Sequence, residues 1–347
     1  FRFGPEKARE VFGFDEAYSI AQLDESLPAL LSDQPAVFCD VGADPEWDRR
    51  VIGWINKVRA QVRSGISAPG EIRDVRRFLD DMRLIKDEHE IATMKRAASI
   101  SSQAHRRAMR ATRPGMHEYE LEAELLHEFR RQGAQAPAYT SIVAGGANAC
   151  VLHYVQNDAL LKEGDVVLID AGCELDGYAS DITRTFPVSG TFSGPQRDIY
   201  ELVLAAQAAA IDQVKPGNEW EAPHEAAVKV LAQGMVDLGL CKGSASGVIE
   251  SGAYRRFYMH RTGHWLGMDV HDAGDYKRGG SWLKLAPGMV LTVEPGCYVR
   301  PAEDVPQQYW NIGVRIEDDA LVTGTACEII TAAAPKHVGD IESLMRD

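Results

Sequence analysis

The chain has 347 residues, of which 45% are hydrophobic and 25% are charged, and this balance excludes a disordered or collagen-like protein. Lys and Arg total 37 against 51 Asp and Glu, so the formal net charge is −14. That acidity argues against nucleic acid or an anionic membrane as the main partner, because both attract basic surfaces. At roughly 100–200 residues per domain, the length predicts two domains.

The six cysteines show no C-x-x-C spacing, and a chain of this length needs no disulfides to fold, so we expect a reducing, cytoplasmic environment. The sequence contains no run of 18 apolar residues, so no membrane span is predicted. The sequence begins FRFGPEK, without an initiator Met or an apolar signal segment. We therefore expect that it starts part-way through a longer protein.

Residues 1–85 predict a small α/β domain. Residues 36–41 form an apolar run typical of a strand, and residues 44–62 have the apolar spacing of a helix. A second helix is expected over residues 71–82. One strand with two helices is little for an independent domain, so we interpret this part as the surviving half of one.

Residues 86–347 predict a second, larger domain. Helices are expected over residues 87–112, 118–132, 196–214 and 219–238. Strands are expected over residues 141–144, 151–155, 166–170, 179–186, 289–294, 313–317 and 320–323. Because helices and strands are grouped rather than alternating, the pattern favours an α+β fold over a parallel α/β fold.

An internal repeat relates the two halves of this larger domain. The run GDVVLIDAGC resembles GMVLTVEPGC, and aligning their first glycines puts Asp170 and Glu294 at the same offset. Each half also offers a later carboxylate, Asp181 in the first and Glu317 in the second. The repeat predicts a pseudo-two-fold sheet whose halves each bring two carboxylates to one place.

These four carboxylates all follow strongly apolar strands. Between Asp170 and Asp181 lies Asp176-Gly177, a hairpin signal that would bring the two aspartates near each other. Like charges at that separation repel unless a cation lies between them. Four carboxylates in one core would be severely destabilising, and two divalent cations would supply +4 against −4.

Three of the ten histidines, His260, His264 and His271, lie within twelve residues in the run YMHRTGHWLGMDVHDAG. The glycines among them would let the backbone approach a ligand closely. A lone histidine is usually structural, whereas three so close together favour a functional site. His153 lies on a strand-like run before Asp170, and taken alone it could be a structural or a functional histidine.

That run, with VLIDAGCELDGYASDITRTF, VLTVEPG and IGVRIEDD, resembles the proline-specific metallopeptidases of the pita-bread fold, and within them most closely aminopeptidase P, the Xaa-Pro aminopeptidases. The resemblance covers about residue 87 to the C-terminus, with a partial N-terminal domain before it. Similar enzymes usually carry a larger N-terminal domain. We expect that roughly the first half of that domain is absent here.

The resemblance implies roles for individual residues. The family's five metal ligands match Asp170, Asp181, His264, Glu294 and Glu317. These donors suit two divalent ions, with Mn²⁺ expected first and Co²⁺ or Zn²⁺ able to substitute. The family's other catalytic and substrate-binding residues match His153, His260, His271, Tyr298, Arg315 and Tyr139.

The implied reaction is hydrolysis of the Xaa-Pro bond, releasing the N-terminal residue from peptides with proline second. Asp181 and Glu317 would bridge two metals that hold a nucleophilic hydroxide, and Glu294 would pass a proton to the leaving nitrogen. The histidines outside the ligand set would stabilise the oxyanion or line the proline pocket. Arg315 would anchor Tyr298 or a peptide carbonyl.

Several alternatives stay open. Prolidase, which cleaves only Xaa-Pro dipeptides, has the same ligand set. Methionine aminopeptidases lack the HRTGHW run, whereas creatinases and the non-catalytic peptide-binding members have typically lost the ligands. A mononuclear iron oxygenase built on His260 and His264 would leave most of the carboxylates unexplained. We expect a cytoplasmic homo-oligomer, a dimer or tetramer, whose partners are peptide substrates.

Overall fold

The computed structural model describes residues 3–346 of the chain. They form two compact units, residues 1–80 and residues 81–347, which divide within helix α4 (Arg76–Leu84). Sequence patterns place the boundary slightly later, after residue 85. None of the helices within residues 3–346 has both the length and the apolar character that a membrane span requires.

The N-terminal unit combines helices with a two-stranded parallel sheet. Its helices are α1 (Pro5–Phe12), α2 (Leu23–Leu31) and α3 (Pro45–Arg59), and its strands are β1 (Ala36–Cys39) and β2 (Glu71–Asp74). The apolar face expected in α3 is buried: it consists of Val51, Trp54, Ile55 and Val58. Helices α1 and α2 were not expected.

The expected helix over residues 71–82 is wrong at its start. Residues 71–74 form strand β2, and the helix begins only at Arg76. Strand β2 pairs with β1, whose residues lie 35 positions earlier, and this long-range pairing overrides the local helical spacing. The Asp74 side chain accepts a hydrogen bond from the backbone N–H of Arg76 at 3.0 Å, a turn that leads the chain from the strand into the helix.

The larger unit contains two antiparallel three-stranded sheets, one in each half of the repeat. The first consists of β4 (Ile142–Gly145), β5 (Val166–Asp170) and β8 (Thr183–Pro187). The second consists of β11 (Val290–Val293), β14 (Asp318–Val322) and β15 (Cys327–Ile329). Smaller ladders join β12 (Gly296–Val299) to β13 (Ile312–Arg315), and β3 (Ala136–Pro137) to β6 (Cys173–Leu175) and β7 (Tyr178–Ala179).

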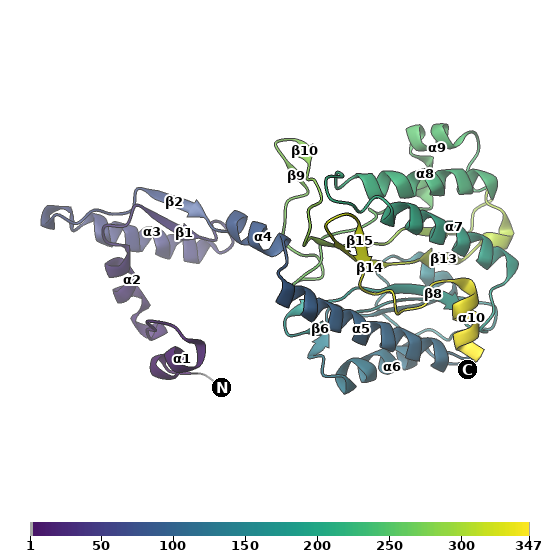
Figure 1. Ribbon diagram of the computed structural model, residues 1–347, viewed down its shortest axis with the longest axis horizontal. Coiled ribbons are helices and arrows are strands. Elements are labelled where there is room, and N and C mark those ends of the chain that lie inside the picture. Colours follow the sequence, from purple (N-terminus) through teal and green to yellow (C-terminus); the bar gives the residue numbers. More distant parts are fainter. Residues whose placement is uncertain (1–2, 347) are drawn as a thin grey trace. The chain divides into compact units, whose positions relative to one another are not determined.

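Four long helices cover these sheets: α5 (Glu88–Ala111), α6 (Glu118–Arg131), α7 (Gly194–Ile211) and α8 (Ala222–Asp237). Helix α5 packs on α6, and α7 packs on α8. Figure 1 shows the first pair on one side of the strands and the second pair on the other, with α10 (Val338–Arg346) beside them. The arrangement confirms the α+β class and the two related halves.

The expected strand over residues 151–155 is also wrong. These residues form turns and an irregular loop after a short 3₁₀ helix (Gly146–Cys150). Val151 and Val155 are 44% and 46% exposed, so their apolar side chains pack on no second sheet. Asn157 fixes the end of the loop, because its side-chain oxygen accepts a hydrogen bond from the Val143 N–H at 2.9 Å.

The turn between Asp170 and Asp181 forms as predicted. Strands β6 and β7 pair antiparallel, and Asp176 and Gly177 between them have φ of 51° and 82°. Positive φ at both central residues is the conformation of a two-residue type I′ hairpin turn. The hairpin returns the chain so that Asp170, the last residue of β5, is paired with Thr183 at the start of β8.

Candidate metal centre

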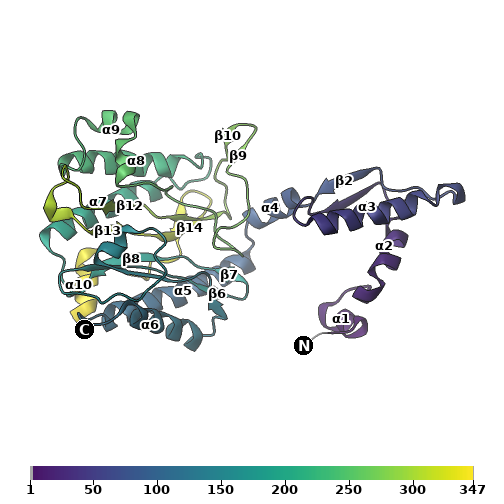
Figure 2. The ribbon, with the colours of Figure 1, turned by 180° about the vertical axis from the view of Figure 1, so that it is seen from behind.

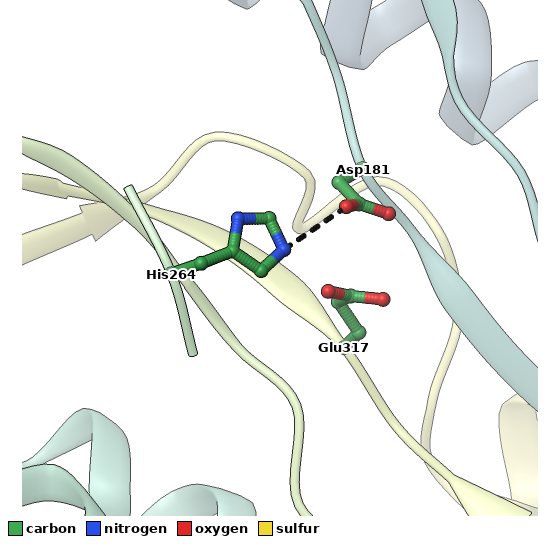
Figure 3. Close-up of side chains that lie close together, drawn as sticks. All are labelled: Asp181, His264 and Glu317. Carbon is green, nitrogen blue, oxygen red and sulfur yellow. Dashed lines mark ion pairs between the residues drawn. The ribbon is translucent and has the colours of Figure 1, made fainter. Parts of the chain in front are cut away.

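Three side chains converge between the two halves of the larger unit. Figure 3 shows Asp181, His264 and Glu317 pointing toward one another, and their ligand atoms all lie within 4.8 Å of each other. Asp181 precedes β8, Glu317 lies between β13 and β14, and His264 lies on a segment beside β11. The Nε2 atom of His264 is 3.4 Å from Asp181 Oδ2.

The segment that carries His264 is fixed along strand β11. The Thr292 N–H donates to the His264 carbonyl at 3.0 Å, and the His264 N–H donates to Thr292 Oγ1 at 3.1 Å. A Cβ at Gly263 would meet the Thr292 carbonyl oxygen at 2.0 Å, so only glycine allows this approach. Since His264 Nδ1 donates to the Trp265 carbonyl at 2.9 Å, Nε2 is the nitrogen free to bind a metal.

Asp170 and Glu294 extend this cluster. The Tyr139 hydroxyl lies 2.7 Å from Asp170 Oδ1 and also contacts Asp181, so one phenol joins the two aspartates. Glu294 Oε1 is 3.7 Å from His264 Nε2. All five expected ligands line one cavity of about 830 Å³.

Burial makes these carboxylates costly to ionise in the protein without a bound cation. Burial and the nearby Asp170 charge raise the pKa of Asp181, and burial raises the pKa of Glu294 to about 7. Burial and the Asp181 charge hold the pKa of Glu317 well above its usual range. Although burial opposes it, contact with Asp181 raises the pKa of His264 to about 9. Oxygen donors and one imidazole in such a setting fit divalent cations, which would let the carboxylates ionise together.

A chain of hydrogen bonds leads from Asp170 to His260. Arg315, only 3% exposed, donates to Asp170 Oδ2 at 2.6 Å and to the Tyr298 hydroxyl at 3.0 Å. That hydroxyl is 2.8 Å from His260 Nε2. Because His260 Nδ1 donates to the Arg261 carbonyl at 2.8 Å, Nε2 accepts the Tyr298 proton. Burial and the Arg315 charge lower the pKa of His260 to about 3, so the ring is neutral at pH 7.

The other two expected histidines lie on the cavity wall. The rings of His271 and His264 meet edge to face with centroids 4.3 Å apart, and burial lowers the pKa of His271. His153, on the irregular loop, also lines the cavity. Tyr298 is 1% exposed and lies outside the lining, but its hydroxyl contacts two lining residues, His260 and Arg315.

Sequence reasoning missed several residues that line the cavity or hold its lining side chains in place. Thr183 donates to Glu317 Oε2 at 2.6 Å and accepts from Arg315 Nε at 3.1 Å. Because Thr183 belongs to the first half and Glu317 and Arg315 to the second, these hydrogen bonds link the two halves. The aromatic and basic residues on the wall were missed as well: they are Trp220, Arg261, Tyr276, Lys277 and Trp282. Arg261 stands within the histidine run, but no spacing in the sequence marks the others.

A buried ion pair supports the loop that carries His271. Lys86 Nζ lies 3.0 Å from Asp272 Oδ2, and the two side chains are 1% and 0% exposed. Arg83 also contacts Asp272 and lies 2.6 Å from Asp269 Oδ2. The Lys86 N–H donates to the Gly288 carbonyl at 2.9 Å, which ties the pair to the turn before β11.

Replacing Lys86 with methionine should lower the free energy of unfolding by about 3 kcal/mol, because Asp272 then keeps only part of its compensating charge. Lys95→Met is the matched control: Lys95 pairs with Glu328 at 2.7 Å, but both side chains are more than 40% exposed. That variant should lose less than about 1 kcal/mol. Chemical denaturation followed by tryptophan fluorescence checks this, and equal losses in the two variants would contradict it.

The match to known proteins identifies the family of this chain. A model of metallopeptidase family M24 matches residues 92–324. The chain belongs to the M24 metallopeptidases. The resemblance drawn from the histidine run and the carboxylate motifs is thereby confirmed at family level.

Individual relatives agree with that assignment. The Xaa-Pro aminopeptidase of Haemophilus influenzae is 48% identical to this M24 chain, over 99% of the chain and 77% of the relative. The Xaa-Pro aminopeptidase of Escherichia coli is 44% identical, over 99% of the chain and 78% of the relative. The solved structure of aminopeptidase PepP from Pseudomonas aeruginosa has a TM-score of 0.97 and 51% identity, covering 99% of this chain and 78% of that one. The expected pita-bread fold is confirmed.

Proposed function

We propose that this chain is a metal-dependent Xaa-Pro aminopeptidase that releases the N-terminal residue of peptides with proline second. The observation that carries the proposal is the convergence of Asp181, His264 and Glu317, within 4.8 Å, in a cavity that Asp170 and Glu294 also line. Relatives that are named Xaa-Pro aminopeptidase, at 44% and 48% identity, support the substrate class.

The metal would be held by side chains from both halves of the unit. We assign the ligands as Asp170, Asp181, His264, Glu294 and Glu317. Their oxygen donors favour two Mn²⁺ ions, with Co²⁺ or Zn²⁺ as substitutes. One solved structure of E. coli aminopeptidase P is described as zinc-substituted, so Zn²⁺ is the first alternative to test. When bound, such ions supply Lewis acidity and water activated near neutral pH.

Glu294 is the residue best placed to move a proton. Its side chain is 17% exposed, lines the cavity, and has Oε2 3.7 Å from His260 Nδ1. It would accept the proton of the attacking water and deliver it to the proline nitrogen as the amide bond breaks. His153 and His271, on the wall, would donate hydrogen bonds to the carbonyl oxygen as negative charge develops there.

Selection of proline would depend on a pocket wall without unpaired polar groups. Proline has no N–H and presents an apolar ring, so it favours flat surfaces whose polar atoms already have hydrogen-bond partners. His260 provides such a surface, because Tyr298 and the Arg261 carbonyl occupy both of its ring nitrogens. Arg315 holds Tyr298 from behind and would thereby fix the orientation of the His260 ring.

His271→Ala should lower kcat by about 10- to 100-fold while both metal ions stay bound, because His271 packs on a ligand without belonging to the ligand set. His337→Ala, an exposed histidine on the far C-terminal segment, is the control and should keep full activity. Metal analysis beside steady-state kinetics checks the prediction. Loss of one ion in His271→Ala would place this residue among the ligands instead.

All of these residues lie within residues 81–347, so we propose that this unit is the catalytic domain and that residues 1–80 belong to an accessory α/β domain. The six cysteines are free, which supports a reducing compartment such as the cytoplasm. Light scattering on the purified protein tests for the expected dimer or tetramer.

A peptide panel tests the proposed function. With Mn²⁺ added to metal-free protein, Xaa-Pro-Xaa peptides should release their first residue, whereas Xaa-Ala-Xaa peptides should be cleaved much more slowly. Cleavage of Xaa-Pro dipeptides alone would make this a prolidase. Equal cleavage of the proline and alanine peptides would remove the proline preference.

A further inference from the structure

The cavity wall carries a positive charge that the proposed reaction does not use. Strands β9 (Lys277–Arg278) and β10 (Ser281–Trp282) form a hairpin, which Figure 2 shows at the edge of the larger unit. Gly279 and Gly280 have φ of 57° and 85°, the positive values that a two-residue hairpin turn requires. This turn pairs Lys277 directly with Trp282 across the two strands.

The pairing fixes the Lys277 ammonium over an aromatic ring. Its Nζ lies 3.8 Å from the centroid of the Trp282 ring, and both residues line the cavity. A cation at this distance from tryptophan is attracted to the ring face, which restricts the motion of a long side chain. Lys277 therefore presents a positioned charge.

Two neighbouring cations are already paired, whereas Lys277 is not. Arg261 also lies over the Trp282 ring, at 5.3 Å, but its guanidinium contacts the Glu221 carboxylate. Arg278 pairs with Asp275 at 3.0 Å and with Asp81. Within residues 3–346, Lys277 has no carboxylate within ion-pair distance. Its charge is available to a ligand in the cavity.

The position of this charge indicates which part of a peptide it meets. His260, on the proposed proline wall, is followed directly by Arg261, whose side chain reaches Trp282 and thus the Lys277 site. The amino end of the substrate lies at the metal ligands, so the chain beyond proline extends away from them by about 3.3 Å per residue. The terminal carboxylate of a short peptide would therefore lie toward the wall of the cavity, which Lys277 lines.

We propose that Lys277, held on Trp282, binds the free terminal carboxylate of short peptides and so favours them as substrates. The inference rests on the proposed Xaa-Pro aminopeptidase function and adds to it a preference about the far end of the substrate. An ammonium that is positioned in advance loses little freedom on binding, which makes the contact worth more than an ordinary surface ion pair.

The test compares one Xaa-Pro-Xaa tripeptide as the free acid with the same peptide as the terminal amide. The acid should have about 10-fold higher kcat/KM, the effect of one hydrogen bond to a charged group. Lys277→Met should reduce this ratio to about 1, and Lys277→Glu should favour the amide. Trp282→Leu should lower the ratio partly. Lys284→Met, a lysine of the same segment outside the cavity lining, should leave the ratio unchanged.

The outcomes separate this inference from the proposed function. Equal cleavage of acid and amide by the unaltered protein would overturn the inference alone, and so would a ratio that survives in Lys277→Met. Absence of cleavage of both peptides would overturn the proposed function itself. The ratio should also fall toward 1 as salt rises from 0.01 M to 1 M, because salt screens an exposed charge.

Discussion

Replacing Glu317 with alanine should lower kcat/KM for an Xaa-Pro-Xaa peptide by at least about 1000-fold, which corresponds to several kcal/mol of lost transition-state stabilisation. Glu317 is 2% exposed, accepts a hydrogen bond from Thr183 at 2.6 Å, and has a ligand oxygen within 4.8 Å of those of Asp181 and His264. Glu317 belongs to the second half of the unit, and through these contacts it meets residues of the first half at the proposed metal site. Its loss should also reduce the bound metal.

Glu328→Ala is the matched control, since this glutamate lies on the neighbouring strand β15 and its side chain is 49% exposed. It should keep full activity and full metal content. Kinetics and metal analysis on dialysed samples measure both properties. If Glu317→Ala keeps activity within about 10-fold of the unaltered protein, then Glu317 holds no essential metal.

Glu294→Gln should reduce kcat by about 100- to 10,000-fold, the range for loss of a general acid–base group. Glutamine keeps the shape and one oxygen donor, but it cannot accept a proton. Glu294 faces the cavity between His264, at 3.7 Å, and His260, also at 3.7 Å. The fall should therefore appear mainly in kcat, with KM nearly unchanged.

The control for this variant is Glu303→Gln, an exposed glutamate in the loop after β12. Both proteins are to be assayed at saturating Mn²⁺, and the bound metal measured in the same samples. Full turnover by metal-loaded Glu294→Gln would show that another group moves the proton.

Local patterns predicted the parts of the fold that depend on neighbouring residues. Strand β5 spans residues 166–170 as expected, because a continuous apolar run ending in an aspartate specifies both the strand and its end. The Asp176-Gly177 turn formed because that pair adopts positive φ readily. The proposed metal ligands were inferred from a motif resemblance and from the cost of burying four carboxylates.

Features that depend on distant partners were not predictable from the sequence. Strand β2 exists through its pairing with β1, and the loop over residues 151–155 is fixed by Asn157 rather than by its own apolar residues. The contact of Lys277 with Trp282 requires the register of a short hairpin, and the burial of Lys86 requires Asp272, far along the chain. Their side chains give no periodic signal, so only the folded structure brings them together.

Titration of metal-free protein with Mn²⁺, following both binding and cleavage of an Xaa-Pro-Xaa peptide, tests the central claim most directly. Five donors from both halves of the unit line one cavity, and four of them are carboxylates. We predict that activity is absent without metal and rises to its maximum as the second equivalent binds. Full activity with one equivalent, or cleavage by the metal-free protein, would contradict a dinuclear Xaa-Pro aminopeptidase.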